Sequence, residues 1–494
     1  MAMGTCVYVP VKLEEDDQRV IRPDHGNHLL TMKEGCTRTP AFLENDAKSF
    51  RVDQGRRPSF DMSRRLASLD VFRGLTVVLM IIVDDAGGVL PAINHSPWDG
   101  VTLADFVFPF FLFMVGVSIG LAYKKLPSKL SATRKAIFRA LKLVAIGLFV
   151  QGGFLHGVND LSYGVDINKI RWMGVLQRIA ITYLVTALCE IWLKGEEDPT
   201  TELVSLFSKY KIQWVLTFII TTIYLALLYG LYIPDWEFQV PSTVKCSIRG
   251  DTSPACNAVG MIDRKVLGIN HMYRRPIYIR TEQCSTKSPD YGPLPLDAPS
   301  WCQAPFDPEG LLSSMMAIVT TLIGLHFGHI IVHYKDHNVR VARWSITASG
   351  LLIKGLILNF SGIALNKALY SLSYTCVTAG VGGILFAAVY LLVDVYEYRR
   401  PTIVLEWVGA HALKIYVIVA CNIWLLILQG FYSEEPGNNI NHFQKTDFSP
   451  SKFSVFQYHD TTVTPSHLFL TDAADRGHKI VDDEKGEPVC SHLG

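Results

Sequence analysis

The sequence predicts an all-α integral membrane protein, a multi-pass bundle of about nine transmembrane helices. The mean hydropathy is +0.24, and charged residues make up only 18% of the 494 residues. Apolar runs of about 20 residues recur along the chain, which is the length that crosses the ~30 Å hydrocarbon core of a bilayer. The net charge of +1 excludes the strongly basic character of a nucleic-acid-binding protein.

Nine apolar runs are expected to span the bilayer, each close to the required length. The first contains two acids, Asp84 and Asp85, and the second contains Pro109, which should kink it. The sixth follows Asp307-Pro308-Glu309-Gly310, a helix-start pattern with Asp307 as the N-cap. The seventh is the shortest and carries Lys354. In chain order, the expected spans are 71–90, 104–123, 137–155, 174–193, 213–232, 311–332, 343–359, 371–393 and 403–428.

Lysine and arginine set the predicted orientation, because they concentrate in cytoplasmic loops. Four basic clusters fall on one side if the helices alternate, and that side is predicted to be cytoplasmic. Residues 1–65 then form a disordered cytoplasmic tail, 66–432 the transmembrane core and 433–494 a polar lumenal tail. No cleavable signal peptide is expected, since residues 1–60 lack an apolar segment near the start. The clusters are Arg56, Arg57, Arg64 and Arg65; Lys124, Lys125, Lys129, Arg134 and Lys135; Lys335, Arg340 and Arg343; and Arg399 and Arg400.

The longest loop, residues 233–306, is expected on the lumenal side, as is the loop between the first two spans. It carries an even number of cysteines in a compartment where disulfides persist. We therefore expect two bridges within the loop, and the spacing leaves their pairing open. The cysteines are Cys246, Cys256, Cys284 and Cys302.

The candidate active site lies in Asn94-His95-Ser96-Pro97-Trp98-Asp99-Gly100, between the first two spans. Acids flank His95 on both sides, with Asp84 and Asp85 before it and Asp105 after it. Ionisable residues inside a spanning segment are costly and therefore point to function. Asp105 is expected to fix the tautomer and the orientation of the imidazole.

Asp70, Arg73 and Asp84 are spaced so that they share one face of the first helix. Arg73 and Asp84 are separated by roughly 16 Å along the axis. A cation at the cytoplasmic end and a carboxylate at the lumenal end are expected of a site that draws one substrate from each side. The alternative is that Asp70 and Arg73 form only an interfacial ion pair.

Several longer motifs point to one known family of membrane enzymes. They are SLDVFRG (68–74), HSPWDGVTLAD (95–105), VFP (107–109), GVLQR (174–178) and DPEG (307–310). Together these motifs resemble the heparan-α-glucosaminide N-acetyltransferase family over roughly residues 64–432. LGINH (267–271) and PSWC (299–302) are similar to the plant branch of that family.

The resemblance implies that an acetyl group passes from cytosolic acetyl-CoA, a cosubstrate, to a lumenal amine. In the lysosomal enzyme that amine is the terminal glucosamine of heparan sulfate. The family's active-site histidine falls on His95 and its active-site asparagine falls on Asp84, where this chain differs. Because an ionised aspartate would repel a developing oxyanion, Asp84 is expected either to be protonated or to serve the amine instead.

These observations assign catalysis to His95, which deprotonates the acceptor or briefly carries the acetyl group, with both routes open. Asp105 would orient His95, Asp84 would position the acetyl group or the amine, and Arg73 would help to hold the coenzyme A phosphates. Arg178, one turn inside the fourth span, is expected to pair with Asp84 or Asp105.

Three histidines at helical spacing, His326, His329 and His333, lie near the cytoplasmic end of the sixth span. Helical spacing alone is a weak sign of a metal site, and no metal is assigned. We predict that His326 and His329 contact coenzyme A at the cytoplasmic mouth, and simple interfacial packing is the alternative.

The predicted partners are acetyl-CoA, an amino-sugar or other amine acceptor and the lipid bilayer; nucleic acid is excluded and a homodimer is left open. A lysosomal or vacuolar membrane is the expected location, with the plasma membrane as an alternative. The competing function is a proton-coupled transporter of a small solute, in which the intramembrane acids and histidine relay protons.

Overall fold

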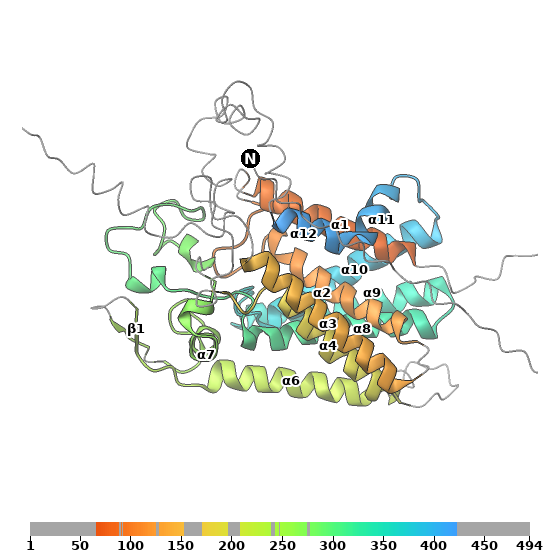
Figure 1. The fold of residues 1–494 in the computed structure, drawn as a ribbon, viewed down its shortest axis with the longest axis horizontal. Helices are drawn as coiled ribbons and strands as arrows, with labels where there is room; N and C mark the ends of the chain where they lie inside the picture. The colour runs from red at the N-terminus through yellow and green to blue at the C-terminus, as the bar shows by residue number, and fades with distance from the viewer. Residues whose placement is uncertain are drawn as a thin grey trace, which may run out of the picture. The chain divides into compact units, whose positions relative to one another are not determined.

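The computed structural model describes residues 66–87, 90, 92–124, 128–152, 170–195, 208–238, 243–246, 248–273 and 277–421 (Figure 1). The chain divides into two units, Met1–Ser63 and Arg64–Gly494, and all described residues belong to the second. The expected cytoplasmic tail and the expected polar lumenal tail lie outside the described residues.

Helices occur at all nine ranges where spans were expected, and short elements fill the long loop. The loop contains a two-stranded antiparallel ribbon, a nine-residue helix and three 3-10 turns. In chain order the elements are α1 (Ala67–Ala86), α2 (Leu103–Ala122), α3 (Lys129–Gly152), α4 (Val175–Trp192), α6 (Lys211–Gly230), β1 (Trp236–Glu237), β2 (Thr243–Val244), α7 (Ala258–Val266), η1 (Ile269–His271), η2 (Ile277–Arg280), η3 (Ser300–Gln303), α8 (Leu311–His333), α9 (His337–Phe360), α10 (Leu372–Tyr390), η4 (Leu391–Val395), α11 (Ile403–Ala410) and α12 (Ala412–Ala420).

Six helices among the described residues are long and apolar enough to cross a membrane, namely α2, α4, α6, α8, α9 and α10 with η4. They support a multi-pass membrane protein, whereas the expected count of about nine is not confirmed. α1 and α3 are long enough but carry several charged residues each. The last expected span is not one straight helix, since α11 and α12 meet at a bend of 73° and would add a seventh crossing only as a broken pair.

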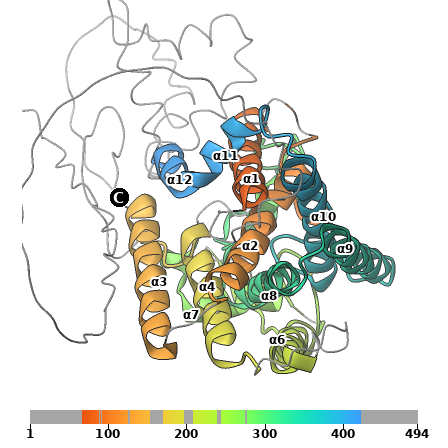
Figure 2. The same ribbon diagram turned by 90° about the vertical axis from the view of Figure 1, so that its right-hand side faces the viewer.

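α2 and α8 form the centre of the helical unit (Figure 2). Buried residues make up 89% of the apolar window of α8, against 17% for α6 and α9, whose exposed apolar faces suit lipid. Close contact of α2 and α8 depends on glycine: a Cβ at Gly116 would lie 2.0 Å from the Thr321 carbonyl oxygen, and one at Gly324 would lie 2.1 Å from that of Phe113. Small residues that let backbones approach are typical of membrane helix pairs.

The long loop folds against the loop that carries His95. Its four cysteines form Cys246–Cys256 and Cys284–Cys302, so the expectation of two bridges is confirmed and the pairing is decided. Trp98 of the His95 loop is buried against Tyr278 and Phe306, with ring centroids 6.1 and 5.6 Å away. The two loops therefore lie at the same end of the helices, as their predicted placement on one side of the membrane requires.

Candidate active site

The loop between α1 and α2 is held in place by two distant parts of the chain. Gly100 has a φ of +98°, and its amide donates to the Leu365 carbonyl at 2.7 Å. Asn366 donates to the Asp99 carboxylate at 3.1 Å. On the other side, the Trp98 indole donates to the Thr252 carbonyl at 3.1 Å. The loop that presents His95 is thus pinned by both the α9–α10 connection and the long loop.

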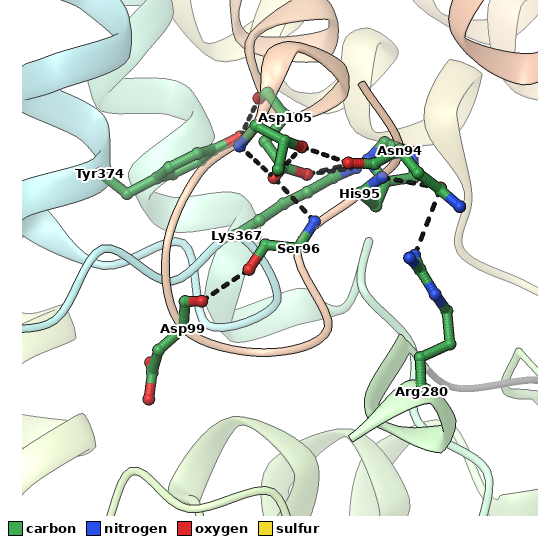
Figure 3. A network of polar contacts seen from close by, with 9 residues as sticks. Asn94, His95, Ser96, Asp99, Asp105, Arg280, Lys367 and Tyr374 are labelled. Atoms are coloured by element: carbon green, nitrogen blue, oxygen red, sulfur yellow. Dashed lines mark hydrogen bonds and ion pairs between the residues drawn. The ribbon is translucent and has the colours of Figure 1, made fainter. Parts of the chain in front are cut away.

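His95 and Asp105 are brought together as the sequence predicted (Figure 3). His95 Nδ1 lies 2.8 Å from Asp105 Oδ1, and the Asp105 side chain is fully buried while that of His95 is 33% exposed. The other carboxylate oxygen, Oδ2, accepts from the backbone amides of Ser96 at 3.1 Å and Thr102 at 3.0 Å. Asp105 therefore closes the first turn of α2 and orients the imidazole with the same carboxylate.

Lys367 completes the site, and the sequence reasoning missed it. Its Nζ lies 2.9 Å from Nδ1 and 3.3 Å from Nε2 of His95, and 3.5 Å from Asp105 Oδ1. It comes from the α9–α10 connection, 272 residues away from His95 along the chain. The only signal in the sequence was topological, because the predicted orientation places that connection on the same side as His95.

Asp84 stands on the last turn of α1 and is exposed. Its charge reaches His95, where it favours the protonated ring. The net effect on the imidazole is nevertheless the reverse: burial lowers the pKa of His95, the Lys367 ammonium lowers it further, and Asp105 and Asp84 only partly oppose them. A lowered pKa keeps the ring neutral, and so able to accept a proton, to a lower pH than a free histidine.

An arginine supports the site from the long loop. Arg280 donates to Asn94 Oδ1 at 3.3 Å, and the same oxygen accepts the His95 amide at 2.7 Å. Arg280 also donates to the Pro289 carbonyl at 2.8 Å, so its guanidinium links the long loop to the His95 loop. From α10, the Tyr374 hydroxyl donates to the Asp105 carbonyl.

The start of α8 differs from its prediction. The N-cap is Gly310 rather than Asp307, and a distant carboxylate, Asp263 Oδ1, accepts the Leu311 amide at 2.8 Å. Asp307 instead binds Arg171, whose guanidinium lies 2.5 Å from Asp307 Oδ1 and 2.5 Å from Glu309 Oε2. Burial alone would lower the pKa of Arg171, but these two carboxylates outweigh it and raise the pKa.

Arg178 does not pair with Asp84 or Asp105 as expected. It is buried, and its guanidinium donates to the Ser314 hydroxyl at 3.1 Å, to the Pro308 carbonyl at 2.9 Å and to the hydroxyl of Ser313. Two serine hydroxyls and a backbone carbonyl at the start of α8 bind its guanidinium instead, so Arg178 fastens α4 to the start of α8.

Arg73 lies in the first half of α1, whereas Asp84 and the His95 loop lie at the end of this helix. It donates to Asp70 Oδ1 at 2.7 Å and to the Ser118 hydroxyl of α2 at 3.2 Å. Its side chain is 27% exposed, so the interfacial pair weighed for Asp70 is present and the guanidinium is still accessible. Contact between Arg73 and coenzyme A remains a prediction.

His326 and His329 lie inside the helical unit. His329 Nε2 is 2.8 Å from Glu190 Oε2 of α4, and its ring stacks on Tyr210 at 3.6 Å. His326 lies edge-on to Trp214, 5.2 Å between ring centroids. Among the described residues, no group of three or more potential ligands could hold a metal ion. Both rings contact protein groups in this structure, and their contact with coenzyme A remains a prediction.

Comparison with known proteins adds a family to this geometry. Residues 65–233, which include Arg73, Asp84, His95 and Asp105, match the family described as heparan-alpha-glucosaminide N-acetyltransferase, catalytic. The heparan-alpha-glucosaminide N-acetyltransferase of Mus musculus is 30% identical over 425 residues, covering 76% of this chain and 60% of the relative. The Homo sapiens protein of the same name is 28% identical over 425 residues, covering 75% and 59%. The chain thus spans about three-fifths of the length of these relatives.

Proposed function

We propose that the chain is a membrane acyltransferase of the heparan-α-glucosaminide N-acetyltransferase family with acetyl-CoA as its donor, which the family match and the two relatives support. The acetyl group would leave cytosolic acetyl-CoA and reach an amine on the lumenal side. The observation that carries the proposal is the pairing of His95 Nδ1 with a buried Asp105 carboxylate at 2.8 Å, in a loop inside the family match.

The pair suits proton transfer during acetyl transfer. With Nδ1–H donated to Asp105, Nε2 keeps its lone pair and can take a proton from the attacking amine. The amine nitrogen forms a bond to the thioester carbonyl carbon, the C–S bond breaks, and the thiolate leaves and is protonated. In the alternative route Nε2 attacks the thioester first, the C–S bond breaks and the thiolate leaves; the amine then attacks the acetyl-imidazole, loses a proton and releases the neutral ring.

The acceptor would be an amino-sugar or another amine, and Asp84 would bind it. An amine acceptor is an ammonium cation until it loses a proton. The Asp84 carboxylate, which lies within electrostatic reach of His95, would attract that ammonium group. Asp84 would hold the ammonium group next to the base that deprotonates it. In this role the negative charge of Asp84 is favourable, whereas it would repel an oxyanion.

Binding of acetyl-CoA to the purified protein tests the function. We expect saturable binding that free coenzyme A displaces, followed by transfer of labelled acetyl to glucosamine. Arg73→Gln should weaken binding about tenfold, the effect of losing one charge-assisted hydrogen bond. Arg399→Gln, which removes an exposed arginine near the α10–α11 connection, should leave binding unchanged.

A proton-coupled transporter is the second candidate, favoured by the buried Glu190–His329 pair between helices. A solute carrier would show neither acetyl-CoA binding nor transfer. Absence of both from folded wild-type protein would therefore favour transport over the acyltransferase.

We further propose that all nine helical regions cross the membrane, with α11 and α12 as one broken crossing. The charged residues that distinguish α1 from the six apolar helices are partly neutralised, since Arg73 pairs with Asp70. This pairing lowers the cost of placing α1 in the membrane. A reporter inserted after residue 60 should be cytoplasmic, and one in the 233–306 loop should be lumenal. Both reporters on one face would contradict the span count and the two-sided site.

A further inference from the structure

The ammonium group of Lys367 lies close to both nitrogens of the His95 imidazole. Its Nζ is 2.9 Å from Nδ1 and 3.3 Å from Nε2, so its charge acts on the whole ring. Only 17% of the Lys367 side chain is exposed. Bulk water therefore screens this interaction less than it would screen a surface pair.

The backbone around Lys367 keeps the ammonium group in that position. The Asn366 amide donates to the Ser371 hydroxyl at 3.1 Å, and the Leu369 amide donates to Asn366 Oδ1 at 2.8 Å. The Tyr370 amide donates to the Lys367 carbonyl at 3.1 Å, with Tyr370 itself at a φ of 58°. The connection is thus built as a tight turn that presents one lysine to the histidine.

Charged groups from α1, α2 and the α9–α10 connection act on His95. Asp105 contacts the ring from α2, and Asp84 acts on it from α1. Arg280 donates to the neighbouring Asn94 and acts electrostatically on Asp105, and Glu309 acts on Lys367. Two carboxylates alone would stabilise an imidazolium, which can accept neither a proton nor an acetyl group. Lys367 is the cation in contact with the ring that opposes them.

We propose that Lys367 is a positioning residue that keeps His95 neutral beside two carboxylates, so that the histidine still accepts a proton at a pH at which a free imidazole would be protonated. This inference rests on the proposed function, in which His95 acts as base or acetyl carrier. Lys367 itself touches the imidazole and Asp105, and it acts on the reaction through them.

The first test is the pH dependence of acetyl transfer in reconstituted protein. Lys367→Met removes the charge, so His95 should protonate more readily and the acid limb of the profile should move up by about one pH unit. Lys367→Arg keeps the charge and should keep the acid limb near its original pH. Lys354→Met, the same change on the exposed face of α9, should not move it.

The second test does not depend on activity. Diethyl pyrocarbonate modifies neutral imidazole, so its rate at His95, followed by peptide mass mapping, reports protonation of that ring directly. The midpoint of this modification should rise by a similar amount in Lys367→Met and stay in Lys367→Arg. If the methionine variant does not fold, Lys367→Gln, which is also neutral, takes its place.

The two readouts separate failure of this inference from failure of the proposed function. An unchanged His95 midpoint in folded Lys367→Met or Lys367→Gln protein would overturn the inference, whatever the activity. A raised midpoint supports it. A raised midpoint in a protein that binds no acetyl-CoA would instead reject the acyltransferase while the control of His95 protonation by Lys367 stands.

Discussion

His95→Ala is expected to abolish acetyl transfer while the protein stays folded and membrane-inserted. Loss of a general base typically costs 10²–10⁴-fold in rate, roughly 3–5 kcal/mol of transition-state stabilisation. The loss is greater still if the imidazole carries the acetyl group, because that route disappears with the ring. The rate of transfer from labelled acetyl-CoA to glucosamine at saturating concentrations measures the effect.

A second histidine serves as the matched control. His271 lies in the long loop, where its Nδ1 is 2.7 Å from the Ile170 carbonyl, and His271→Ala should leave the transfer rate within a few-fold of wild type. Asp105→Asn should impair transfer less than His95→Ala, since it disturbs orientation without removing the reacting group. A His95→Ala protein with full activity would end the proposed mechanism.

Asp307→Ala should be among the most destabilising single changes just before α8. It removes the fully buried partner of Arg171, which is 18% exposed and then faces Glu309 alone. Removing one partner of a buried ion pair typically costs about 3–5 kcal/mol, because the remaining charge is left poorly compensated. Thermal unfolding of the detergent-solubilised protein should show the loss as a clear drop in the unfolding temperature.

Replacing the charged side chains by neutral ones of similar size separates their ionic contribution to stability from their contribution to packing. Arg171→Met combined with Asp307→Leu and Glu309→Gln removes all three charges of this cluster and should recover most of the lost stability, since apolar pairs often substitute well for buried ion pairs. An Asp307→Ala protein that unfolds within a degree of wild type would show that Glu309 alone suffices for Arg171.

Local features were readable from the sequence because they depend on neighbours along the chain. Long apolar runs predicted where the helices lie, since a helix in lipid must satisfy its own backbone. His95 and Asp105 are ten residues apart, at the end of a loop and the start of a helix, so their contact needed only that short connection to close. The oxidised state of the four loop cysteines followed from their even number and expected compartment.

The number of membrane crossings was harder to predict, because some helices are long enough to cross a bilayer but carry charged residues that oppose insertion. α1 and α3 are as long as the apolar helices, yet their charged residues exclude them from the six that pass on composition. The break at His411 between α11 and α12 had no signal that separates a bent helix from a straight one of equal hydropathy.

Only the tertiary structure decided which distant residues meet. Cys246 pairs with Cys256 and Cys284 with Cys302, whereas the spacing of the four cysteines would have allowed other pairings. Arg178 found hydroxyls and carbonyls at the start of α8 instead of the predicted acids. Lys367 reaches His95 across 272 residues because the α9–α10 connection packs against the His95 loop. Helix packing, and not the local pattern of residues, thus places a cation beside His95.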